Sequence, residues 1–108
     1  MQNINTTVLA RRVRISDSCT THPYEAGWAH EGVIFVQTEG EHPPLTVHLE
    51  VSPDGIHWIA RPGEVALAAG DALAELPVTN FGNWLRLRIE GAKADAPARV
   101  LVHAAMKG

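Results

Sequence analysis

One segment decides the fold class of this chain: Leu45-Thr46-Val47-His48-Leu49-Glu50-Val51-Ser52-Pro53-Asp54-Gly55-Ile56-His57-Trp58. Its first eight residues alternate between apolar and polar, which is the period-2 pattern of a β-strand with one buried and one solvated face. The Pro-Asp-Gly sequence that follows is typical of a turn, because proline fixes φ, aspartate bonds the local backbone and glycine accepts positive φ. The segment therefore predicts a β-hairpin.

The length of the turn sets which side of the hairpin carries Trp58. A four-residue loop pairs Val51 with Trp58 and buries the indole, whereas a three-residue loop places Trp58 opposite Glu50 on the polar face. We expect the four-residue loop, because a slip of one residue would turn a large apolar ring away from the core. In that register the solvated face of the hairpin carries His48, Glu50 and His57.

Further strands are predicted on both sides of the hairpin. Residues 84–90 alternate cleanly, residues 98–106 form a last strand, and residues 8–15 form a first strand with Leu9, Val13 and Ile15 on one side. Residues 32–37 are a continuous apolar run, which indicates a central strand buried on both faces. Residues 16–28 are rich in Ser, Thr, His and Pro and are expected to form a long connection.

The alanine-rich segment 64–76 has two possible structures. Alanine favours helix, but Gly70 would cost a helix about 1 kcal/mol and no good N-terminal cap precedes the segment. We prefer two short strands hinged at Gly70 and Asp71 and ended by Pro77, with the helix as the alternative. The total is then about seven or eight strands, which predicts an all-β, antiparallel, jelly-roll-like β-sandwich with residues 1–108 in a single domain.

Composition narrows the classes of function. The chain has 108 residues, a net charge of −3 and only nine basic residues, so we expect no nucleic-acid partner. Residues 1–7 have no signal-peptide pattern and no apolar run is long enough to span a membrane, which predicts a cytoplasmic protein. The single cysteine, Cys19, excludes an internal disulfide and a zinc site built from cysteines.

No catalytic or metal-binding motif is recognisable, so we expect no enzyme activity, no cofactor and no metal. His48 and Glu50 share a strand face, and a third ligand would have to be His57 or His103, but solvent-facing histidines explain the pattern equally. Cys19 lies three residues before His22, which would lower the pKa of the thiol if the side chains met. A small, half-buried loop cysteine is the expected alternative.

An outward stripe of Trp84, Arg86 and Arg88 is the clearest candidate for a binding surface, because tryptophan and arginine often anchor interfaces. Trp28 is the second candidate. The alternative is that the chain's own loop covers Trp84, and that the two arginines pair with Glu50 or Glu90.

Residues 52–58, followed by residues 80–89, resemble the discoidin-like (galactose-binding-like) jelly rolls, which have a similar Ser-x-Asp-Gly-x-x-Trp hairpin and a later aromatic-x-Arg strand. The same pair of segments also resembles small β-sandwich proteins of phage-like particles. The resemblances bear mainly on the fold. The function hypotheses depend on the outward stripe, on apolar edges at Val8 and Val100 that a small sandwich must cover or pair, and on the lack of a catalytic motif, an export signal and a disulfide. The first is protein–protein assembly, as a homo-oligomer or part of a larger assembly, in the manner of a decoration, cement or tail-accessory protein, with a virion location if the gene belongs to a phage. The alternative is carbohydrate binding, with Trp84 or Trp28 stacking on a sugar, and a histidine-based metal site comes third.

Overall fold

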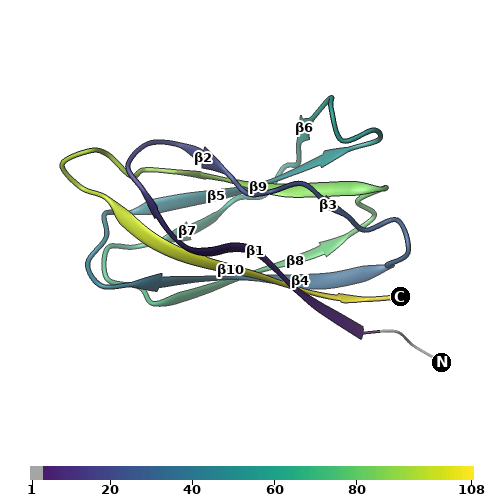
Figure 1. Ribbon diagram of the computed structural model, residues 1–108, viewed down its shortest axis with the longest axis horizontal. Coiled ribbons are helices and arrows are strands. Elements are labelled where there is room, and N and C mark those ends of the chain that lie inside the picture. Colours follow the sequence, from purple (N-terminus) through teal and green to yellow (C-terminus); the bar gives the residue numbers. More distant parts are fainter. Residues whose placement is uncertain (1–3) are drawn as a thin grey trace.

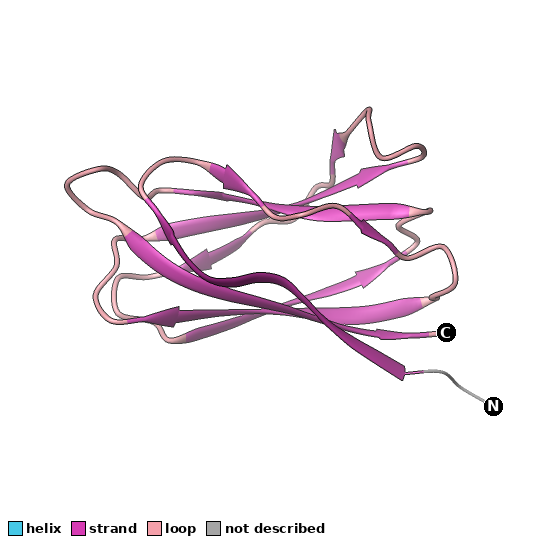
Figure 2. Cartoon of the chain, in the orientation of Figure 1, coloured by secondary structure: helices cyan, strands magenta, loops and turns pink. Residues whose placement is uncertain are grey.

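The computed structural model describes residues 4–108, which form two antiparallel β-sheets packed face to face (Figures 1 and 2). This confirms the predicted all-β sandwich. The first three residues of the segment 1–7 lie outside the described residues. No helix among the described residues has the length and apolar character needed to cross a membrane.

Ten strands make up the two sheets. The four-stranded sheet has the order β1 (Ile4–Ile15), β10 (Ala98–Lys107), β4 (Glu31–Glu39), β8 (Leu73–Thr79). The six-stranded sheet has the order β2 (Cys19–Thr20), β9 (Trp84–Glu90), β5 (Leu45–Ser52), β6 (Ile59–Ala60), with β3 (Tyr24–Glu25) also pairing with β9 and β7 (Val65–Leu67) with β5. Most of the strands beyond the seven or eight predicted are only two residues long, which is too short to show a periodic pattern. The connection predicted for 16–28 includes two of them, β2 and β3, along the edge of β9.

The core lies between the two sheets and follows the alternation of the long strands. In β9 the side chains of Leu85, Leu87 and Ile89 are fully buried, as predicted, and they face the buried side chains of the other sheet. The largest fully buried side chains are Ile34, Leu45, Leu67, Leu85, Leu87, Ile89, Met106, Val36, Val47, Val100 and Val102. Burial of each such side chain stabilises the fold by roughly 1.5–3 kcal/mol.

The predicted hairpin forms, but its register is wrong by one residue. Glu50 pairs with Ala60 and Val51 pairs with Ile59. This register places Trp58 on the same face of the sheet as Glu50, and not opposite Val51. The loop is longer because its side chains bond the backbone. The Ser52 hydroxyl accepts hydrogen bonds from the backbone N–H groups of residues 54 and 55, and the Asp54 carboxylate accepts them from residues 56 and 57.

Segment 64–76 forms two strands, as preferred, and Gly70 adopts a φ of +90° in the turn between them. Pro77, however, does not end the second strand, because β8 continues to Thr79. β8 is the edge strand of its sheet. A proline has no N–H group to donate, but no neighbouring strand needs that donor on the open side of an edge strand.

Two other predictions need correction. In β1, Leu9 and Ile15 are buried but Val13 is 42% exposed, because register shifts between Val8 and Val13 rotate the strand. In β4, the chain covers only one face of the run 32–37. Ile34 and Val36 are buried, whereas Val33 and Phe35 are only partly buried on the outer face of the sheet.

Candidate functional site

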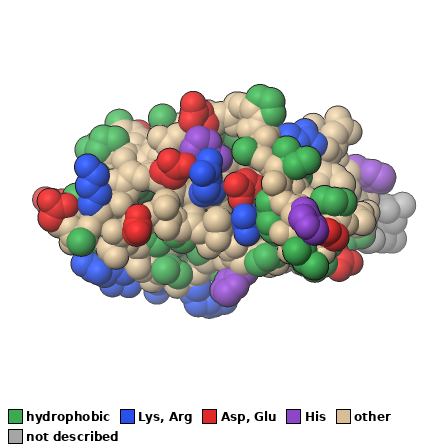
Figure 3. Space-filling view, turned by 90° about the horizontal axis from the view of Figure 1, so that it is seen from above, with side chains coloured by type: hydrophobic (Ala, Val, Ile, Leu, Met, Phe, Trp, Pro, Cys, Tyr) green, Lys and Arg blue, Asp and Glu red, His purple; other side chains and the backbone are tan. Residues whose placement is uncertain are grey.

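The outer face of the six-stranded sheet brings the predicted stripe of β9 against β5. Trp84, Arg86 and Arg88 lie on this face, opposite Ser52, Glu50 and His48 respectively. Figure 3 looks onto this side of the molecule, where acidic, basic and histidine side chains gather over the middle of the sheet. We call the group of His48, Glu50, Glu64, Arg86, Arg88 and Glu90 the charged face.

Glu50 is the centre of the charged face and is not solvated, contrary to the prediction for this side of the hairpin. It is only 8% exposed, and Arg86 Nε donates a hydrogen bond of 2.7 Å to its Oε1 atom. Arg88 lies 3.6 Å from the second carboxylate oxygen, which is an ion pair but too long for a hydrogen bond. Arg88 also pairs with Glu90 at 3.1 Å. The two arginines therefore neutralise a buried carboxylate.

His48 lies at the other end of the same face. Its ring nitrogens are 3.7 Å from Glu64 and 3.5 Å from Glu90, so it is flanked by two carboxylates. His57 instead turns towards Asp54, with 2.7 Å between Nδ1 and Oδ2, and His103 belongs to the other sheet. Neither of them joins His48 and Glu50. Among residues 4–108, no three His, Cys, Asp or Glu side chains form a group suited to a metal ion.

The chain itself covers two tryptophans near the charged face. The Arg86 guanidinium lies 4.2 Å from the centre of the Trp58 ring, which is a cation–π contact. Gly55 packs on Trp84 so closely that a Cβ atom at this position would come within 3.2 Å of the ring. The Asp54–Gly55 turn therefore covers part of Trp84, as the alternative interpretation of the stripe predicts.

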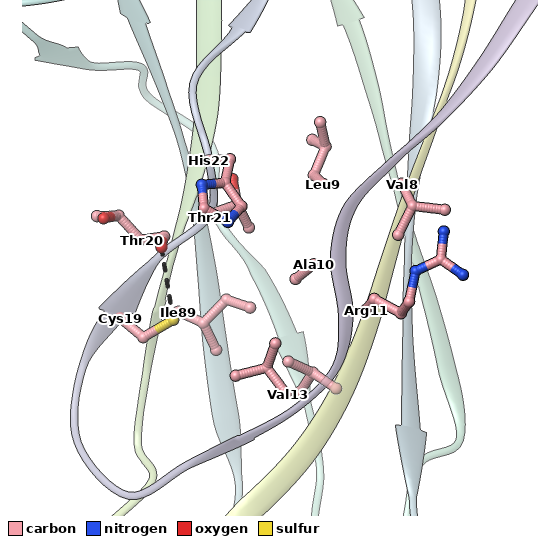
Figure 4. Close-up of a pocket in the computed structure, with 11 residues that line it drawn as sticks. Val8, Leu9, Ala10, Arg11, Val13, Cys19, Thr20, Thr21, His22 and Ile89 are labelled. Carbon is pink, nitrogen blue, oxygen red and sulfur yellow. Dashed lines mark hydrogen bonds between the residues drawn. The ribbon is translucent and has the colours of Figure 1, made fainter.

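Trp28 and Cys19 complete the candidates from the sequence. Trp28 is 40% exposed in the turn before β4. Cys19 lines a pocket of about 360 Å³ beside the irregular part of β1, and in Figure 4 the His22 ring lies away from its sulfur. Burial raises the pKa of the Cys19 thiol, which opposes the activation by His22 considered above.

Asp54 gives the hairpin loop a pH dependence. Hydrogen bonds to its carboxylate, first from the backbone N–H of His57 and then from the His57 ring, lower its pKa well below the ordinary 3.8. The ionised form therefore favours the folded state. This contribution to stability is present above the ordinary pKa and is lost as the pH falls through the lower value of the folded state.

We expect Asp54→Asn, which keeps an acceptor oxygen but removes the charge, to lower the free energy of unfolding at pH 7. The difference from the parent protein should shrink steadily below about pH 4, because the Asp54 carboxylate of the unfolded parent chain then takes up a proton while that of the folded chain stays ionised. Urea unfolding from pH 7 to pH 2 measures both curves. Parallel curves over this range would contradict the assignment.

The outer face of the four-stranded sheet is a second surface, of which the sequence indicated only the apolar edge at Val8. Partly buried or exposed apolar side chains from all four strands lie side by side there. We call this surface the apolar face: Val8, Val33, Phe35, Leu73, Pro77, Leu101 and Ala105. A shallow pocket of about 420 Å³ lies between Val33, Phe35 and Pro77. A signal is present in the sequence, because residues 32–37 and 98–106 carry apolar side chains at successive positions, but such runs are equally typical of strands that the chain itself covers on both faces.

A comparison with curated proteins gives no match. A sequence model of the family DUF6385, described as a domain of unknown function, matches residues 29–107. The match includes β4 to β10, and thus most of the apolar face and all of the charged face. Because the match spans well over half of the sequence, this chain belongs to the DUF6385 family.

Proposed function

We propose that this chain is a non-enzymatic module that works by protein–protein assembly. The observation that carries the proposal is the apolar face. Large apolar side chains at successive positions of a central strand are usually covered on both sides, and here the chain covers only one. An exposed apolar patch that spans a whole sheet is typical of an interaction surface.

The charged face supports a different role. Its arginines pair with Glu50 and Glu90, and of the two tryptophans beside it, Trp58 contacts Arg86 and Trp84 packs under the Gly55 turn. These contacts stabilise the fold of the monomer. We therefore place the assembly surface on the opposite side of the sandwich, and not on the stripe around Trp84.

A place in a phage-like particle, as a decoration, cement or tail-accessory protein, is the finer form of the proposal. It is supported by the resemblance of residues 52–58 and 80–89 to small β-sandwich proteins of such particles. The alternative, carbohydrate binding, needs an uncovered aromatic ring. It now depends on Trp28, because Trp84 is only partly exposed beneath its loop.

We expect Phe35→Lys to abolish self-association while the fold persists. Phe35 lies at the centre of the apolar face, and the new lysine would lie opposite Glu75 within the same sheet. Loss of a central aromatic anchor typically weakens an interface by about 30-fold or more, and a symmetric dimer loses the anchor twice. Sedimentation velocity over a range of concentrations measures the change.

The matched control is Ile59→Lys, which adds the same charge at an apolar residue that is 66% exposed on the other sheet. The control should associate like the parent chain. A parent chain that sediments as an 11.7 kDa monomer at every concentration, or equal association of Phe35→Lys and the parent, would contradict the proposal.

A further inference from the structure

Charged side chains around the apolar face are sorted by strand. The positions that point outward on β1 and β10 include Arg14, Arg99 and Lys107, and Arg12 reaches across to Glu39 at 3.0 Å. The outward charged positions on β4 and β8 are all acidic: Glu31, Glu39 and Glu75. The charged positions in the β1–β10 half of the face are therefore basic and those in the β4–β8 half are acidic, and the apolar residues lie on all four strands among them.

This pattern is complementary to itself. We infer that the apolar face binds a second copy of this chain, with a two-fold axis that runs parallel to the strands between β10 and β4. Rotation about this axis places β4 of one copy over β10 of the other, and β8 over β1, so that acidic strands face basic strands. The inference rests on the proposed function and names its partner.

The other two-fold arrangement is disfavoured by charge. An axis across the strands, in the plane of the interface, would place β10 over β10 and β4 over β4. Lys107 would then approach Arg99 of the second copy, and Glu31 would approach Glu39. Contacts between like charges at an interface are strongly unfavourable, and they exclude wrong pairings.

The apolar residues fit the first arrangement. Val33 of one copy lies over Ala105 of the other, and Phe35 lies over His103, because these residues are neighbours in the ladder between β4 and β10. Two sheets that pack in this way are about 10 Å apart and rotated by about 30°. The long side chains of Glu31 and Lys107 can bridge the offset that this rotation produces at the ends of the strands.

The size of the face is sufficient for a reversible dimer. Four strands about 4.8 Å apart and nine residues long, at about 3.4 Å per residue, cover a rectangle of about 19 Å by 30 Å. Two copies would then bury about 1,100 Å² in total, close to the lower limit of about 1,000 Å² for a specific interface. We therefore expect a dimer that dissociates on dilution.

A pair of charge reversals tests the arrangement. Lys107 and Glu31 are neighbours in the ladder, and no ion pair joins them within the part of the chain that is described. Lys107→Glu alone places two acidic pairs in the proposed dimer, and Glu31→Lys alone places two basic pairs. Each variant alone should dimerise about 10-fold or more weakly than the parent chain.

Mixing the two variants should restore association, because both contacts in a mixed dimer join opposite charges. Native mass spectrometry should show the one-to-one mixed dimer in excess over either homodimer. Mixing cannot repair a defect within one chain, so recovery identifies a contact between copies. The controls Lys93→Glu and Asp95→Lys change the net charge equally in a loop outside the face and should behave like the parent chain.

Three results would overturn the inference in distinguishable ways. Tighter dimerisation of Lys107→Glu alone would indicate the axis across the strands. Association of the parent chain that Phe35→Lys abolishes, without recovery on mixing, would leave the proposed function in place and refute this arrangement. A parent chain that stays monomeric up to about 1 mM would refute both the dimer and self-assembly as the function.

Discussion

Replacing Arg86 by Met is expected to lower the free energy of unfolding by about 3 kcal/mol, because it leaves the carboxylate of Glu50 buried without its hydrogen-bonded partner. Arg86 donates the 2.7 Å hydrogen bond to Glu50, whereas Arg88 approaches only to 3.6 Å and cannot replace it. The variant also loses the cation–π contact with Trp58, worth about 0.5–1 kcal/mol at a site of this exposure.

Urea unfolding at pH 7 and a single protein concentration measures this loss. Lys93→Met, in the exposed loop before β10, should change the free energy of unfolding by less than about 0.5 kcal/mol. The double variant Glu50→Gln with Arg86→Met should recover about half of the loss, because the buried charge is then gone as well. An effect of Arg86→Met no larger than that of Lys93→Met would show that Glu50 is stabilised in another way.

The strands with one solvated face could be predicted closely from the sequence. The bounds of β5 and β9 agree with the predicted segments, because each residue there contacts either the core or the outer surface, and its polarity follows from that. The division of 64–76 into two strands was also predictable, since Gly70 interrupts the segment where the turn needs positive φ.

The hairpin register was not predictable from turn types alone. Proline, aspartate and glycine suggest a short loop, but the side chains of Ser52 and Asp54 bind four backbone N–H groups and lengthen it. The position of Trp58 then depends on Arg86, which comes from a strand 28 residues later and stacks on the ring. Such contacts depend on the tertiary fold, which local pattern reasoning does not include.

The candidate site was only half predictable for a related reason. Alternation placed Trp84, Arg86 and Arg88 on one face correctly. Whether these side chains are free to bind a partner depends on Glu50 and on the turn at Gly55, and the register of β5 brings both of these against them. The apolar run 32–37 indicated burial on both faces. A sequence pattern does not reveal whether the chain itself or a second molecule covers the outer face.

Replacing Gly91 by Ala is expected to lower the free energy of unfolding by about 4 kcal/mol, for two separate reasons. Gly91 adopts a φ of +118°, where a residue with a Cβ atom is strained by about 1–3 kcal/mol. In addition, a Cβ atom would collide with the carbonyl oxygen of Pro44 and approach the Cα atom of Leu45 to 3.3 Å. Relief of this overlap requires a shift of the backbone and costs about 1–3 kcal/mol more.

Gly70→Ala separates the two causes. Gly70 has a φ of +90° but no atom within 4 Å of the position of a Cβ, so this variant carries the strain without the collision and should cost only about 1–2 kcal/mol. The excess cost of Gly91→Ala then measures the close approach at the start of β5, where Thr46 and Glu90 form the last pair of the central ladder. Hydrogen exchange of the Thr46 amide should rise in Gly91→Ala and stay unchanged in Gly70→Ala. Equal destabilisation by both variants would mean that the β5 and β9 ends can separate at no cost, which the burial of Leu45 and Ile89 beside this pair opposes.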